Sequence, residues 1–87
     1  MPVLRCTNGT SVSVQAGSRN YSKPRDDIGP YSKFELGFPS DGMLIDAIRR
    51  YPENPDQPYD TVYCWVPRAA IAQLIKDNGG LTEGRLP

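Results

Sequence analysis

Nine prolines and eight glycines divide this 87-residue chain into short segments, and their spacing limits the fold more than any other feature. Proline removes a backbone donor and glycine weakens regular structure, so short elements joined by ordered loops are expected instead of a helical bundle. Hydrophobic residues make up 38% of the chain and gather in patterned blocks between these breakers. The length fits one globular unit, so we expect residues 1–87 to form a single compact domain.

The N-terminal region predicts a β-hairpin. Residues 3–6 form a short apolar run, and the following Asn8-Gly9 is the dipeptide most typical of a type I′ hairpin turn. Residues 11–16 then alternate between apolar and polar side chains, as expected of a strand with one buried and one solvated face.

A long loop and a third strand follow the hairpin. Residues 17–32 contain no apolar period, and a loop of this length in a compact domain is usually functional or disordered. Residues 33–38 alternate again, which predicts a strand. Its expected core face consists of Phe34, Leu36 and Phe38.

Apolar residues at helical spacing first appear over residues 43–51. Ser40 or Asp41 is the expected N-terminal cap, because either side chain can accept a hydrogen bond from a free backbone N–H group. Pro52 ends the predicted helix. The apolar stripe consists of Leu44, Ala47, Ile48 and Tyr51.

The proline-rich residues 52–60 are expected to form a stiff connector that leads into a strand over residues 61–66. This strand is β-branched and aromatic, which is typical of a central strand or of one whose outer face is covered. Simple alternation divides it into two faces, with Val62, Cys64 and Val66 on one and Tyr63 and Trp65 on the other.

A second helix is predicted after Pro67, because apolar residues recur at helical spacing over 70–75 and Asn-Gly-Gly at 78–80 is a typical C-terminal cap. Residues 82–87 then resemble a tail. The element order is β-β-β-α-β-α. We therefore expect an α+β domain, with an antiparallel sheet of about four strands and two helices packed on one face.

Enzymatic and metal chemistry find little support in the residue types present. The chain has no histidine, which removes the commonest general base and the commonest metal ligand. Cys6 and Cys64 are too few for a structural zinc site, and we expect two reduced thiols, or a disulfide if their strands are neighbours. No phosphate-binding glycine motif occurs, so neither a cofactor nor a catalytic residue is expected.

The acidic residues are explained better as turn residues than as catalytic groups. Asp26 and Asp27 are the only adjacent pair and lie in the predicted loop, while Asp56 and Asp60 lie in the connector. Their spacing matches no calcium-binding loop, and aspartates in loops commonly bond their own backbone. We therefore predict that the chain is not an enzyme.

A basic and aromatic cluster lies in the predicted long loop. Single-stranded nucleic acids are bound by such mixtures, because cations follow the phosphates and rings stack on the bases. Asp26 and Asp27 follow directly and cancel much of the local positive charge, so nucleic-acid binding remains an alternative. The cluster consists of Arg19, Tyr21, Lys23 and Arg25.

A second aromatic cluster surrounds the last predicted strand. Tyr63 and Trp65 share one predicted face, which either packs into the core or forms an exposed patch that anchors a partner. Tyr59 upstream and Arg68 downstream would enlarge such a patch, and Tyr21 would join it if the loop folds across.

Ten basic and ten acidic residues give no net charge. This balance excludes a strongly basic nucleic-acid coat and a polyacidic mimic of DNA. No apolar run is long enough to cross a membrane and no secretory signal follows Met1, so we expect a cytoplasmic protein.

In size, lack of catalytic residues and general character, the chain resembles the small proteins with which bacteriophages block host factors, such as the anti-CRISPR proteins. The resemblance covers no specific stretch, so no site residue is carried over from it. It implies an inhibitor that binds a host protein or nucleoprotein complex. We therefore predict a non-enzymatic protein-binding module, with a nucleic-acid-binding accessory protein and a homo-oligomer, such as a homodimer, as alternatives.

Overall fold

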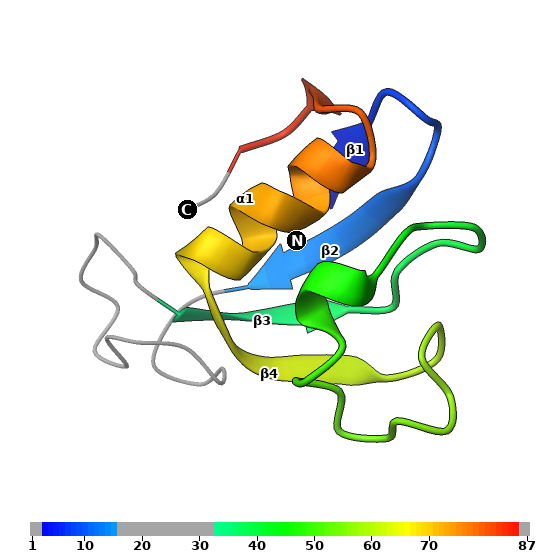
Figure 1. Ribbon diagram of the computed structural model, residues 1–87, viewed down its shortest axis with the longest axis vertical. Coiled ribbons are helices and arrows are strands. Elements are labelled where there is room, and N and C mark those ends of the chain that lie inside the picture. Colours follow the sequence, from blue (N-terminus) through cyan, green and yellow to red (C-terminus); the bar gives the residue numbers. More distant parts are fainter. Residues whose placement is uncertain (1–2, 16–32, 86–87) are drawn as a thin grey trace.

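One antiparallel sheet organises the computed structural model, which describes residues 3–15 and 33–85 (Figure 1). Within these ranges the sheet has five strands in the order β4-β3-β2-β1-β5, and α1 and the short turn η1 lie on one of its faces. The predicted α+β class with an antiparallel sheet is confirmed. The elements are β1 (Val3–Cys6), β2 (Ser11–Gln15), β3 (Lys33–Gly37), η1 (Asp46–Ile48), β4 (Val62–Pro67), α1 (Arg68–Asp77) and β5 (Leu81–Glu83).

The hairpin of β1 and β2 is present as predicted, with Leu4 opposite Val12. Its turn differs from type I′, because only Gly9 has a positive φ (86°), whereas that turn needs positive φ at both central residues. The Asn8 side chain closes the turn instead, since its Oδ1 accepts a hydrogen bond from the Thr10 N–H (3.1 Å).

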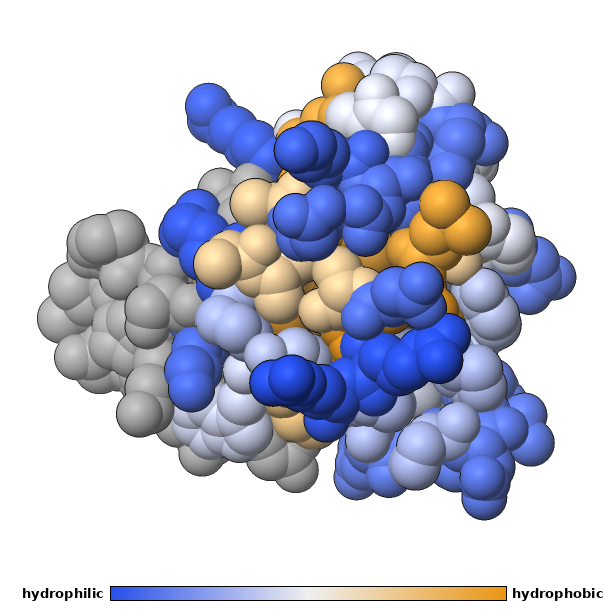
Figure 2. All heavy atoms as spheres, in the orientation of Figure 1, coloured by the Kyte–Doolittle hydropathy of each residue, from blue (hydrophilic) through white to orange (hydrophobic). Residues whose placement is uncertain are grey.

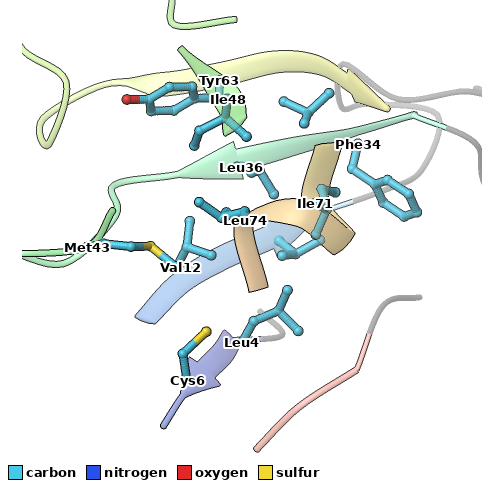
Figure 3. Packing of buried hydrophobic residues seen from close by; sticks show 12 residues of the cluster. Leu4, Cys6, Val12, Phe34, Leu36, Met43, Ile48, Tyr63, Ile71 and Leu74 are labelled. Atoms are coloured by element: carbon cyan, nitrogen blue, oxygen red, sulfur yellow. The ribbon is translucent and has the colours of Figure 1, made fainter. Parts of the chain in front are cut away.

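The hydrophobic core fills the space between the sheet and the two helical elements, as Figure 3 shows. The alternating residues of β2 and β3 meet the apolar stripe of α1 there. Each fully buried aliphatic side chain stabilises the fold by about 1.5–3 kcal/mol. The fully buried side chains include Leu4, Val12, Val14, Phe34, Leu36, Ile48, Ile71 and Leu74.

The prediction of a helix over residues 43–51 is wrong, because only the three residues of η1 are helical, in a 3₁₀ turn. Ile45, just before η1, has a non-helical backbone (φ −118°, ψ 15°) and makes no side-chain capping bond. The expected cap, Ser40, is used elsewhere, since its Oγ accepts a hydrogen bond from the Ser11 N–H (2.8 Å).

The prediction of a tail from residue 82 is also wrong, because β5 forms a fifth strand beside β1. Arg5 pairs with Glu83 in the register of these strands, and their side chains form an ion pair of 2.8 Å. All three residues of β5 are exposed, so this edge strand has no alternation of buried apolar residues from which it could be predicted.

A bulge in β4 overturns the predicted alternation of its side chains. Phe34 lies opposite Val66 and Leu36 opposite Tyr63, so β4 uses one residue more than β3 over this stretch. Trp65, inside the bulge, has a φ of 58°. Tyr63 and Val66 therefore both face the core, although simple alternation places them on opposite faces.

The two cysteines are free thiols on strands that are not neighbours. Cys6 lies on β1 and Cys64 on β4, with β2 and β3 between them. Three strand spacings separate these strands by roughly 14 Å, whereas disulfides need Cα atoms within about 7 Å. The fold excludes the disulfide between them. Among the described residues, no helix has the length and apolar character needed to cross a lipid bilayer.

Candidate functional site

The aromatic patch predicted around β4 is not assembled as expected. Tyr63 is 1% exposed, and its hydroxyl donates a hydrogen bond to the Pro58 carbonyl (2.7 Å), so its ring belongs to the core. Trp65 is half-buried at the bulge. Arg68 is exposed, with its guanidinium carbon 5.0 Å from the centroid of the Phe34 ring, a cation–π contact. Tyr59 alone of these keeps the role of an exposed aromatic.

The basic and aromatic cluster of the predicted loop lies outside the described residues. This holds for every member of the cluster, namely Arg19, Tyr21, Lys23 and Arg25. Its role in nucleic-acid binding therefore stays a prediction.

Three large apolar side chains are exposed at the end of the sheet where β3 ends and β4 begins: Phe38 (57%), Leu44 (57%) and Tyr59 (37%). The Phe38 N–H donates to the Thr61 carbonyl (3.1 Å), two residues after Tyr59. The Tyr59 hydroxyl in turn donates to the carbonyl of Met43 (2.6 Å), next to Leu44. We call Phe38, Leu44 and Tyr59 the 38–44–59 surface. In Figure 2 a hydrophobic group stands out over the loop that joins β3 to η1.

The backbone that carries Leu44 is held at every polar group. The Met43 N–H donates to the Ser40 carbonyl (3.1 Å), and its carbonyl accepts from Tyr59. The Leu44 N–H donates to Asn78 Oδ1 (2.9 Å), and its carbonyl accepts from Asn78 Nδ2 (2.9 Å). The Met43 side chain is buried and anchors the segment in the core. Leu44 is therefore an exposed side chain on a fixed support.

The support depends on the buried amide of Asn78, which is 1% exposed. Besides its two bonds to Leu44, its Nδ2 donates to the Leu74 carbonyl (2.8 Å) and its Oδ1 accepts from Asn8 Nδ2 (2.8 Å). The amide thus joins α1, the hairpin turn and the loop before η1. Sequence reasoning identified Asn78 only as part of a helix cap, because its partners Leu44 and Asn8 are 34 and 70 positions away in the chain.

Phe38 leaves the regular strand geometry that its place in the alternating pattern predicts. Its φ is 47°, in the left-handed region, and its side chain faces solvent and not the core. For a residue with a side chain this conformation costs about 1–2 kcal/mol. Backbone strain of this kind tends to occur at functional sites, so the strain is a reason to connect Phe38 with function.

A pocket of about 210 Å³ is lined in part by residues that are next in the chain to the 38–44–59 surface. Two of its lining residues are chain neighbours of that surface, since Ile45 follows Leu44 and Pro58 precedes Tyr59. Small-molecule and cofactor sites usually measure about 300–1,000 Å³. The pocket is smaller and fits one side chain of a partner better than a cofactor. It is lined by Ile45, Arg49, Pro52, Pro55, Pro58 and Tyr63.

Two titratable groups beside β4, the Cys64 thiol and the Glu35 carboxyl, have raised pKa values. Burial raises the pKa of the Cys64 thiol, and the charges of Glu53 and Glu35 raise it further. Burial and the charge of Glu53 also raise the pKa of the Glu35 carboxyl. A thiol with a raised pKa stays protonated and is a poor nucleophile. Within residues 3–15 and 33–85, no three acidic or thiol side chains are placed to hold a metal ion.

No family model, curated protein or solved structure matches this chain.

Proposed function

We propose that the chain is a non-enzymatic protein-binding domain and that the 38–44–59 surface is its contact region. The observation that carries this proposal is the display of Leu44, which is 57% exposed on a backbone whose polar groups are all bonded. A backbone held in this way loses little freedom on binding, and this pre-organisation favours affinity.

The composition of the region supports the same function. Aromatic residues are enriched in protein interfaces, and a few of them usually dominate the binding energy. Phe38 and Tyr59 add two exposed rings to Leu44, while the pocket can receive one apolar side chain from the partner. The protruding side chains and the pocket together allow a contact in which each protein inserts side chains into the other.

The inhibitor of a host protein or nucleoprotein complex, expected from the resemblance to bacteriophage proteins, is a specific form of this proposal. The balanced overall charge and the lack of histidine support it. Cytoplasmic action belongs to the same proposal.

The test begins with capture of the partner and ends with its affinity. A photo-crosslinking amino acid at position 38 captures the partner from a lysate of the source organism, and calorimetry with the purified partner follows. We expect Leu44→Ala to weaken binding about 30-fold, as for a residue worth about 2 kcal/mol, with an unchanged urea midpoint.

Leu81→Ala is the matched control, because Leu81 is also an exposed leucine (39%) but lies on β5. It should leave the affinity unchanged. Equal losses for Leu44→Ala and Leu81→Ala, or full affinity when Phe38, Leu44 and Tyr59 are all alanine, would show that the contact region lies elsewhere.

A further inference from the structure

We infer that the partner meets the 38–44–59 surface with a positively charged protein surface, an inference that rests on the proposed function. The charge of the chain is unevenly distributed, although its sum is zero. Residues 38–61 carry five carboxylates against two guanidiniums, a net charge of −3 that the remaining residues offset. The charged residues of this segment are Asp41, Asp46, Glu53, Asp56, Asp60, Arg49 and Arg50.

Two exposed carboxylates outside the Asp46–Arg49 ion pair lie in the chain segments that carry the 38–44–59 surface. Asp41 lies midway between Phe38 and Leu44, and Asp60 directly follows Tyr59. Each of these carboxylates is therefore no more than three residues from an apolar side chain of this surface.

One of the two guanidiniums is already neutralised within the segment. Arg49 NH2 lies 2.7 Å from Asp46 Oδ1, which cancels one positive charge against one negative charge. Four carboxylates and Arg50 then remain, so the acidic character of the segment persists after pairing.

This charge distinguishes between the partners considered for the chain. A second copy joined through the same surface would bring identical carboxylates together, because a two-fold interface is self-complementary. A nucleic acid would present phosphates to them, and phosphate contacts require cations. A basic protein surface complements the carboxylates, suppresses wrong partners and speeds association.

Defined peptides test the inference without knowledge of the natural partner. Three synthetic peptides share a central Phe-Leu pair and differ only in flanking residues, which are lysine, serine or aspartate. Fluorescence polarisation with the full chain measures each affinity. We expect the lysine-flanked peptide to bind about tenfold tighter than the serine-flanked peptide at low salt, with the difference shrinking at high salt.

Charge variants of the chain then locate the effect. Asp41→Asn and Asp60→Asn should each weaken the lysine-flanked peptide about two- to fivefold, as expected for exposed charge pairs. The controls are Asp77→Asn and Glu83→Gln, which remove exposed carboxylates outside residues 38–61. Both should leave the affinity for the lysine-flanked peptide unchanged.

The outcomes separate this inference from the proposed function. If Leu44→Ala weakens binding of every peptide but the flanking charges have no effect, the inference is overturned and the proposed function stands. If neither Leu44→Ala nor Phe38→Ala changes the affinity for the peptides, the proposed contact region is wrong. Failure of every peptide to bind, or tight binding of an oligothymidine probe to this surface, overturns the inference.

Discussion

Residues 43–51 and residues 68–77 carry similar apolar stripes, yet only the second segment becomes an α-helix. Ile71 and Leu74 of α1 and Ile48 of η1 are all buried in the same core. The stripes therefore predicted the burial of Ile48, Ile71 and Leu74 correctly, but they also assigned the exposed Leu44 to the core. They did not decide how far each helix extends.

The difference lies in the partners of the backbone groups. In residues 43–51, both polar groups of Leu44 bond to the Asn78 amide, and the Tyr51 carbonyl accepts from the Cys64 N–H of β4 (3.0 Å). Tertiary contacts thus take the groups that a longer helix would need. α1 instead closes on itself, since the Gly80 N–H donates to the Ile75 carbonyl (2.9 Å).

The largest expected effect follows from removing the Asn78 side chain, which bonds both backbone polar groups of Leu44. Asn78→Ala should cost about 3 kcal/mol of unfolding free energy, because the backbone N–H and carbonyl of Leu44 and the Asn8 amide lose their hydrogen bonds to the buried Asn78 side chain. Urea denaturation measures this loss, and hydrogen exchange at Leu44 should accelerate. Asn54→Ala is the control, since Asn54 is exposed and its Oδ1 accepts one bond, from the Asp56 N–H (3.2 Å). Equal costs for the two variants would refute the role given to Asn78.

A smaller effect is expected where α1 closes its own end. Gly79 has a φ of 92°, and a methyl group there would collide with Thr7 Oγ1. Gly79→Ala should cost about 2 kcal/mol, against about 1 kcal/mol for Gly80→Ala, whose added methyl meets nothing within 4 Å at a similar φ of 97°.

A double-mutant cycle in urea denaturation isolates the collision at Gly79. In a Thr7→Ala background, the cost of Gly79→Ala should fall to that of Gly80→Ala, because the colliding oxygen is gone. An unchanged cost would assign the whole effect to the backbone.

The smallest expected effect is a pH dependence of the unfolding free energy, which comes from Glu35 and its neighbour Glu53. The Glu53 N–H pairs with the Val62 carbonyl (2.9 Å), which brings Glu53 toward Glu35. The folded state raises the Glu35 pKa above 4.5, so its contribution is favourable at lower pH. That contribution is lost as the pH rises through the raised pKa.

Urea midpoints measured between pH 4 and pH 7 test this dependence. The midpoint of the wild type should fall relative to that of Glu35→Gln as the pH rises, and Glu53→Gln should reduce the fall. Parallel profiles for the wild type and Glu35→Gln would contradict the raised pKa, and an unchanged fall in Glu53→Gln would contradict the contribution of Glu53.

Local signals in the sequence were sufficient for the hairpin, for β3 and for α1. Asn8-Gly9 marked the first turn, and the alternation around Phe34 and Leu36 marked a buried face. β5 was missed because its three residues are all exposed and gain their strand conformation only from β1. The bulge at Trp65 was missed because register is set by the neighbouring strand and not by the local pattern.

The candidate site was predicted only in part. Tyr59 was expected in an exposed aromatic patch and is exposed. Phe38 and Leu44 were assigned to the core, because their positions fit apolar periods of a strand and a helix. A positive φ at Phe38 and the bonds from Asn78 to Leu44 turn both outward, and neither cause is visible along the chain.

The position of β5 also constrains how the chain acquires its fold during synthesis. The first hairpin can form early, but β1 gains its second neighbour only when residues 81–83 leave the ribosome. The amide bond between Asn8 and Asn78, which are 70 positions apart, must wait equally long. Contacts that close such large loops form slowly, so a nascent or truncated chain would leave one side of β1 open to premature association with other chains.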